Sequence, residues 1–143
     1  MSLTPEDFHD PRQLFDRVPF IALLGLRRVY SEGGRARLQL PPRADLGNVI
    51  GAVHGGAVFT MLDVAMASAA VSRFDFQQTA VTMNISSSYL SPGRGMLTAD
   101  GEWLHDSDGV AFCRARVEDE HGTLVAQAQG SFRYLPLPGG TPS

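Results

Sequence analysis

The sequence predicts an α+β domain in which an antiparallel sheet of about six strands wraps around one long buried helix. The first observation is the apolar stretch 56–73, which contains no proline and no glycine beyond its start. A helix that is apolar on every side is a buried helix. The second observation is a series of short segments with alternating apolar and polar residues. Turn signals separate these segments, which is typical of antiparallel strands.

Chain length, composition and net charge indicate the number of domains and exclude one class of partner. The 143 residues suit a single domain over residues 1–143, with a core of about 20–134. The tail 135–143 is rich in proline and glycine, and we expect it to be flexible. A formal net charge of −3 provides no basic stripe, so we expect no nucleic-acid partner.

The cellular compartment is predicted from the cysteine content and the N-terminus. The single cysteine, Cys113, excludes an internal disulfide and suits a reducing compartment. The N-terminus has neither the basic region nor the apolar region of a signal peptide. We therefore expect a cytoplasmic protein.

A short helix is expected near the N-terminus. Asp10 is a suitable N-cap, and Pro11 fits the first helical position. Pro19 interrupts the helix, and an apolar continuation over 20–24 ends at Gly25.

Two strands follow as a hairpin. Residues 26–31 and 35–40 are joined at Gly33-Gly34, which is a turn signal. The second strand alternates, with three apolar residues on one face: Ala36, Leu38 and Leu40.

We expect the long helix over residues 56–73. A membrane span needs about 20 apolar residues. This stretch is shorter, and Asp63 places a carboxylate near its centre. We therefore expect a buried helix and no membrane partner.

The rest of the chain predicts four strands, at 80–89, 96–105, 110–118 and 124–134, with turns at Pro92-Gly93, Asp108-Gly109 and His121-Gly122. Their inner faces carry small residues, which would allow the helix to lie close against the sheet. The sheet covers only part of a helix that is apolar all round. A second copy of the chain is the simplest cover for the rest, so we expect at least a homodimer.

Asp63 is the candidate catalytic residue. An ionised carboxylate in an apolar helix is costly unless it is paired or neutralised. The residues three and four positions away cannot pair with it: Phe59, Thr60, Met66 and Ala67. Asp63 is therefore either a structural residue bonded to a backbone amide or a base or nucleophile with a raised pKa.

The segment His54-Gly55-Gly56 lies where a loop becomes the helix. Free N–H groups at a helix N-terminus can stabilise an oxyanion, and glycine lets a substrate approach the backbone closely. His54 suits a cap or a packing role as well as a ligand role. Gly55 and Asp63 are eight residues apart, or about 12 Å along a helix. If both act on one carbonyl, Asp63 of one subunit must serve Gly55 of another.

These residues occur in a pattern that resembles the hotdog-fold thioesterases of the phenylacetic acid degradation type. The pattern comprises the segment 48–56, Asn-Val-Ile-Gly-Ala-Val-His-Gly-Gly, and Asp63 nine residues after the histidine. It continues in 82–92, which ends in Ser-Tyr-Leu-Ser-Pro, and in 122–132. The similarity extends over about 20–134, and the combination of motifs is specific.

The resemblance implies a hotdog fold and hydrolysis of an acyl-CoA thioester to a free acid and CoA. By this resemblance, the amide of Gly55 polarises the thioester carbonyl, and Asp63 activates water or attacks directly. Asn48 positions water or substrate, and the hydroxyl of Thr82 assists. Such proteins form dimers that pair into tetramers, so a homotetramer is expected. They need no metal, and coenzyme A enters as part of the substrate rather than as a cofactor.

Further substrate contacts are expected around the same site. His54 and Gly56 adjoin Gly55 and are candidate substrate-binding residues. Arg94 stands where relatives often carry a basic residue near the CoA phosphates, with Arg73 and Arg133 as alternatives. The apolar surroundings favour an aryl-acetyl or medium-chain acyl group.

The main alternative function is a non-catalytic hotdog protein that binds acyl-CoA as a sensor. Such a protein would keep the pocket and would not need the carboxylate of Asp63. A dehydratase of this fold generally uses a histidine beside a carboxylate in a motif that the sequence lacks. The four histidines have no ligand-like spacing, so no metal site is predicted. No nucleophile-elbow pattern is present for a serine hydrolase.

Overall fold

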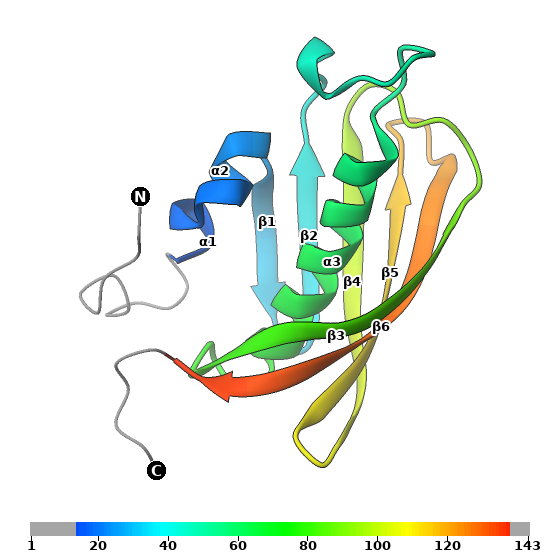
Figure 1. Cartoon of the computed structure of the whole chain (residues 1–143). Helices are drawn as coiled ribbons and strands as arrows, with labels where there is room; N and C mark the ends of the chain where they lie inside the picture. The colour runs from blue at the N-terminus through cyan, green and yellow to red at the C-terminus, as the bar shows by residue number, and fades with distance from the viewer. Residues whose placement is uncertain (1–13, 138–143) are drawn as a thin grey trace.

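The computed structural model describes residues 14–137. It confirms the predicted α+β architecture, with an antiparallel sheet wrapped around one long helix (Figure 1). The predicted N-terminal cap at Asp10 and Pro11 lies outside the described residues.

Two short helices precede the sheet. They are α1 (Leu14–Arg17) and α2 (Pro19–Leu24). Pro19 begins α2, as the sequence predicts. Gly25 ends it in a left-handed conformation, with φ of 72°, which glycine adopts without steric cost.

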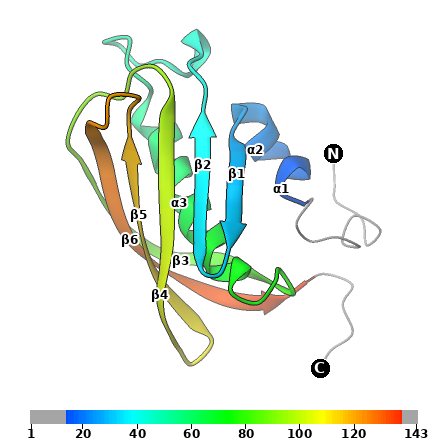
Figure 2. The same ribbon diagram turned by 180° about the vertical axis from the view of Figure 1, so that it is seen from behind.

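The sheet contains six strands: β1 (Arg27–Glu32), β2 (Arg35–Leu40), β3 (Gln78–Tyr89), β4 (Leu97–Ser107), β5 (Val110–Glu118) and β6 (Leu124–Pro136). Their order is β1-β2-β4-β5-β6-β3, and every neighbouring pair is antiparallel. Seen from behind, β1, β2, β4 and β5 run side by side while β3 and β6 sweep across one end (Figure 2). The sheet does not close on itself, and β1 and β3 are its two edges.

The long helix α3 (Gly55–Ser72) lies against the concave face of the sheet (Figure 1). It begins one residue earlier than predicted, because the His54 side chain caps it by accepting a hydrogen bond from the Gly56 N–H. The predicted apolar face of β2 is confirmed as a core face, since Ala36, Leu38 and Leu40 are at most 1% exposed.

Gly101 lets α3 approach the sheet with no side chain between them. It lies on β4, and a Cβ at this position would be 2.2 Å from the carbonyl oxygen of Ala65. The backbone of the helix therefore packs directly on the backbone of the strand, which fixes the position of the middle of α3.

One face of α3 is not fully covered by the rest of the chain. Phe59, Asp63, Ala67 and Val71 are all partly exposed. Residues four positions apart lie on the same side of a helix, so these four form one stripe. The predicted bare face of the helix is therefore present in the single chain.

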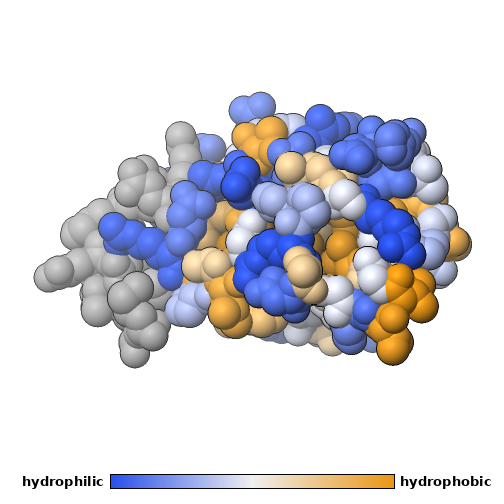
Figure 3. All heavy atoms as spheres, turned by 90° about the horizontal axis from the view of Figure 1, so that it is seen from above, coloured by the Kyte–Doolittle hydropathy of each residue, from blue (hydrophilic) through white to orange (hydrophobic). Residues whose placement is uncertain are grey.

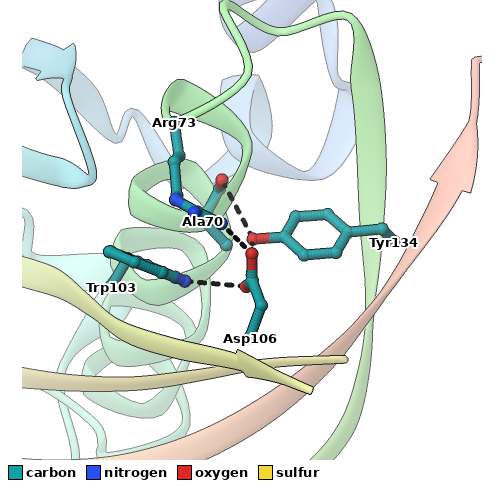
Figure 4. Close-up of polar contacts among 5 residues, drawn as sticks. All are labelled: Ala70, Arg73, Trp103, Asp106 and Tyr134. Atoms are coloured by element: carbon teal, nitrogen blue, oxygen red, sulfur yellow. Dashed lines mark hydrogen bonds and ion pairs between the residues drawn. The ribbon is translucent and has the colours of Figure 1, made fainter. Parts of the chain in front are cut away.

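A polar cluster holds the C-terminal end of α3 against the sheet (Figure 4). The Asp106 carboxylate accepts hydrogen bonds from the Trp103 indole (2.7 Å) and from the Tyr134 hydroxyl (2.9 Å), and it pairs with Arg73. The Arg73 guanidinium also lies over the Trp103 ring, 3.8 Å from the centroid. Arg73 thus has a structural role here, which ties the helix to β4 and β6.

Local details differ from the predicted elements. A short 3₁₀ helix, η3 (Ala44–Leu46), occupies part of the segment predicted as loop. The β3–β6 pair is longer than predicted, because pairing continues to Gln78 opposite Pro136. The same pair contains a bulge at Met83, because Thr82 pairs with Phe132 and Asn84 with Ser131.

Candidate active site

Asp63 lies in the middle of α3, on its partly uncovered stripe, and is half-buried. Its carboxylate accepts a hydrogen bond of 2.6 Å from the Thr82 hydroxyl. Burial raises the pKa of Asp63 above its ordinary value, and the bond from Thr82 lowers it in part. No basic side chain among residues 14–137 forms an ion pair with it. A carboxylate held in this way is suited to take up a proton.

Thr82 reaches Asp63 from the edge strand β3. The bulge at Met83 follows it directly. A bulge bends its strand and re-aims the neighbouring side chains, and bulges are common beside functional sites. Thr82 lies opposite Phe132, which is 0% exposed, so its hydroxyl belongs to the inner face of the sheet and can reach the carboxylate on α3.

A cavity of about 270 Å³ opens beside these two residues. Its apolar lining comes from the N-terminal helices and the residue between them, from α3, from the segment that leads into β3 and from β3 itself: Phe15, Val18, Ile21, Val64, Ala67, Val71, Phe76 and Ala80. The edge strands contribute Arg28 from β1, and Thr79 and Thr82 from β3. The cavity therefore occupies the gap between the two sheet edges, over the face of α3 that the sheet leaves uncovered.

The N-terminus of α3 provides a free backbone donor. The His54 Nδ1 accepts the hydrogen bond of the Gly56 N–H at 2.9 Å, so both of these residues serve the helix cap. Among the described residues, the Gly55 N–H has no acceptor. The Tyr89 hydroxyl donates to the Gly55 carbonyl oxygen at 3.0 Å and so fixes this first turn. A free N–H at this end of a helix suits a developing negative charge.

Asn48 and Arg94 both brace the loop before α3. The Asn48 Oδ1 accepts hydrogen bonds from the N–H groups of Ile50 (3.1 Å) and Ala52 (3.0 Å). The Arg94 guanidinium donates to the carbonyl oxygens of Ile50 and Gly51, both at 3.2 Å. These bonds give both residues a structural role, and their contacts with a substrate stay predictions.

The loop that they hold exposes apolar side chains. Val49 is fully exposed and Ile50 is 62% exposed. Apolar side chains are visible among polar ones at this end of the molecule (Figure 3). Asn48 and Gly55 line a separate hollow here, of about 310 Å³.

One chain thus brings the predicted site residues together as two groups. Asp63 and Thr82 share the apolar cavity, whereas Asn48 and Gly55 share the hollow at the start of α3. Asp63 and Gly55 belong to the same unbroken helix, so about 12 Å of helix separates them. No single carbonyl group can contact both within one chain.

Sequence reasoning missed the cavity walls and Tyr89. Phe15, Ile21 and Arg28 reach Asp63 through packing between segments that are distant in sequence. The only sequence signal was the apolar character of the N-terminal helix, which does not specify what the helix contacts. The bond from Tyr89 to Gly55 joins β3 to α3 and has no local signature.

Comparisons with known proteins agree with this architecture. Residues 12–133 match the family described as "Domain of unknown function (DUF4442)". A relative from Halobacterium salinarum that bears the name "Putative esterase" is 32% identical over 126 residues, which cover 80% of this chain and 83% of the relative.

Two solved structures are informative. The PaaI protein of the phenylacetic acid degradation operon of Escherichia coli superposes with a TM-score of 0.81 at 22% identity, covering 98% of this chain and 99% of that one. A Streptococcus mutans protein solved with bound acetyl-CoA gives a TM-score of 0.71 at 26% identity, covering 78% of this chain and 89% of that one. The chain therefore belongs to the DUF4442 family and shares its fold, the predicted hotdog fold, with the PaaI protein.

Proposed function

We propose that the protein hydrolyses an acyl-CoA thioester to a free acid and CoA, using Asp63 of one subunit and Gly55 of the partner subunit. The observation that carries this proposal is the Asp63 carboxylate, which has a raised pKa, a hydrogen bond from the Thr82 hydroxyl and an apolar cavity beside it. The acetyl-CoA found in the Streptococcus mutans structure supports the substrate class.

The proposed reaction requires two protein groups and water. Asp63 accepts a proton from a water molecule, and the water oxygen forms a bond to the thioester carbon. The negative charge that develops on the carbonyl oxygen is stabilised by the Gly55 N–H at the helix N-terminus. The tetrahedral intermediate then expels the CoA thiolate by breaking the carbon–sulfur bond. The thiolate takes up the proton from Asp63, which restores the carboxylate, and the acid leaves.

Direct attack by Asp63 is the alternative first step. The carboxylate oxygen would bond to the thioester carbon, CoA thiolate would leave, and water would then hydrolyse the mixed anhydride. A single turnover in ¹⁸O-labelled water distinguishes the two routes. Base catalysis places the label in the acid product and none in the protein. The anhydride route, when water attacks the carbonyl carbon of Asp63, places the label in the Asp63 carboxylate and releases an unlabelled acid.

The apolar cavity is the proposed acyl site. Its lining favours an aryl-acetyl or medium-chain acyl group, because an apolar group gains free energy when it leaves water for such a surface. The cavity adjoins Asp63, so an acyl chain that enters it would leave its thioester carbon at the carboxylate.

A second copy of the chain is proposed to complete the site. The edge strand β3 is 12 residues long, and it exposes Val81 and Met83. Long apolar edges are seldom left bare, because they pair with other strands. A partner that covers β3 and the bare stripe of α3 would bring its own Gly55 toward Asp63. We further propose that two such dimers form a tetramer, which sedimentation velocity can test.

The proposed activity is tested by thiol release from a panel of acyl-CoAs. We expect turnover with aryl-acetyl-CoA or medium-chain acyl-CoA, and little with long-chain substrates that exceed the cavity. Binding of acyl-CoA without release of CoA would instead support the sensor function. Neither binding nor turnover with any member of the panel would refute the proposal.

Replacing Thr82 by valine is expected to move the acidic limb of the kcat/KM profile to higher pH. The Thr82 hydroxyl stabilises the ionised form of Asp63, so its loss raises the pKa of Asp63 further. Activity that depends on an ionised base falls below the pKa of that base. The variant should therefore lose activity at a higher pH than the wild type.

The matched control is Thr79→Val, which also alters a cavity threonine on β3 but one without a hydrogen bond to Asp63. Its acidic limb should stay where the wild-type limb lies. An identical limb in Thr82→Val would contradict the proposed interaction.

A further inference from the structure

Arg28 lies at an unusual position for a charged residue. On β1 it pairs with Leu38 of β2, which is 0% exposed. Directly opposite residues of an antiparallel pair share one face of the sheet. The Arg28 side chain therefore belongs to the inner, core-lining face, where it lines the cavity that also contains Asp63.

Two buried aromatic rings hold this guanidinium. Its central carbon lies 5.8 Å from the centroid of the Phe15 ring and 5.7 Å from that of the Phe76 ring. Phe15 and Phe76 are 8% and 9% exposed. These contacts are of the cation–π kind and fix the position of the group, while its N–H donors remain for an acceptor that lies in the plane of the guanidinium.

Arg28 has no acidic partner in the described part of the chain. Among residues 14–137, no carboxylate lies within 4.0 Å of its nitrogen atoms. Of the described residues that line the cavity, only Asp63 is acidic, and it does not pair with Arg28. A plain alkyl chain gains free energy against the apolar lining, but where it reaches Arg28 it would desolvate the guanidinium without giving it a hydrogen-bond acceptor. That part of the contact is unfavourable.

We propose that Arg28 binds the terminal carboxylate of an ω-carboxyacyl thioester whose chain lies in the cavity. This inference rests on the proposed thioesterase function and specifies its substrate class. The planar guanidinium matches a carboxylate with two parallel N–H···O bonds. Its charge also offsets the repulsion between that carboxylate and Asp63 at the reacting end.

Two other roles of Arg28 make different predictions. An inward-pointing charge on an edge strand can discourage strand pairing between molecules, which is a structural role. The guanidinium could also contact a phosphate of CoA. In both cases an alteration of Arg28 would affect all acyl-CoAs alike.

The test compares adipyl-CoA with hexanoyl-CoA, which have acyl chains of equal length and differ in the terminal carboxylate. We expect the wild type to have the higher kcat/KM with adipyl-CoA. In Arg28→Leu, kcat/KM for adipyl-CoA should fall about 10- to 100-fold, the effect of losing hydrogen bonds to a charged group. For hexanoyl-CoA it should rise, because leucine gives the alkyl chain an apolar neighbour.

Two variants serve as controls. Arg28→Lys keeps the charge without the fork of donors, so it should retain part of the preference for adipyl-CoA. Arg27→Leu alters the exposed neighbouring residue of β1 and should leave the preference as in the wild type. Thermal unfolding and sedimentation of each variant show whether fold and assembly are intact.

An equal loss with both substrates in Arg28→Leu would overturn the inference, as would an unchanged preference. A wild type that hydrolyses only hexanoyl-CoA would keep the thioesterase function and refute the carboxylate site. If no thioester is hydrolysed, the carboxylate site can still be tested by binding. Calorimetry then measures the affinity for non-hydrolysable thioether analogues of the two substrates. Tighter binding of the carboxylated analogue, lost in Arg28→Leu, would support the site, and equal binding would refute it.

Discussion

Asp63→Asn is expected to lower kcat/KM for a good acyl-CoA substrate by about 10²–10⁴-fold, the usual contribution of a positioned base. The amide oxygen of asparagine can still accept the hydrogen bond from Thr82, so the geometry of the site should persist. What the variant loses is a group that can accept a proton or attack a carbonyl. Release of CoA thiol by the variant and the wild type measures the effect.

The same substitution should not weaken the fold at neutral pH. Folding raises the pKa of Asp63, so its ionisation destabilises the folded state. This loss of folding free energy is absent below the pKa that Asp63 has in the unfolded chain. It is complete once the pH exceeds the pKa of Asp63 in the folded protein. We therefore expect Asp63→Asn to unfold at the same temperature as the wild type or higher at neutral pH, and to lose any such advantage in acid.

The matched control is Asp75→Asn, which removes an exposed carboxylate shortly after the end of α3. Asp75 has φ of 51°, a conformation that asparagine also tolerates. The Asp75→Asn variant should have the same activity as the wild type. Full activity in Asp63→Asn would refute the catalytic role of Asp63, and a large loss of stability would show that its role is structural.

Gly101→Ala is expected to have the largest effect on stability. The added Cβ would lie 2.2 Å from the Ala65 carbonyl oxygen and 3.0 Å from the Met66 nitrogen, and neither is the end of a flexible side chain. Either α3 or β4 must move, and overpacking of a core costs about 1–3 kcal/mol or more. We expect a loss of at least 3 kcal/mol, roughly the top of that range, in the free energy of unfolding.

Displacement of α3 should also reduce activity, because Ala65 is two residues from Asp63. Chemical denaturation and thiol release measure the two effects. Gly33→Ala is the control, since it has open space around its Cβ and should cost only the strain of its φ of 59°, about 1–2 kcal/mol. Equal stability of the Gly101 and Gly33 variants would contradict the close packing of helix and strand.

The sequence was sufficient to predict those elements whose causes are local. Alternation identified β5 with its ends, Val110 and Glu118, as they occur in the structure. The Asp108-Gly109 turn is also present, with positive φ at both residues. The apolar stretch predicted α3 to within one residue at each end. In each case the signal lies in neighbouring residues.

Features that depend on tertiary packing could not be predicted in this way. The order of strands in the sheet, the contact of Gly101 with Ala65 and the bulge at Met83 all require segments that are distant in sequence. For the candidate site, the sequence alone singled out Asp63 and Gly55, and the resemblance to a family added Thr82. The wall of the cavity became evident only when α2 and β1 were placed beside α3.

A subunit-mixing experiment tests the central claim most directly, namely that Asp63 and Gly55 act across a subunit interface. One variant in the mixture is Asp63→Asn. The other variant is Gly55→Pro, which removes the N–H donor at the first helical position, where proline is tolerated. His54 already has φ of −58° and ψ of 138°, a conformation that suits the residue before a proline. Each variant alone should be nearly inactive.

Unfolding the two variants together and refolding them as a mixture produces hybrid dimers. In a hybrid, one site combines the intact Asp63 of one chain with the intact Gly55 of the other. Random mixing of equal amounts should therefore restore about a quarter of wild-type activity, because half of the dimers are hybrids with one working site each. If both residues of a site came from the same chain, every site in a hybrid would be defective. Failure of the mixture to regain activity, with hybrids demonstrated by mass spectrometry, would contradict the shared site.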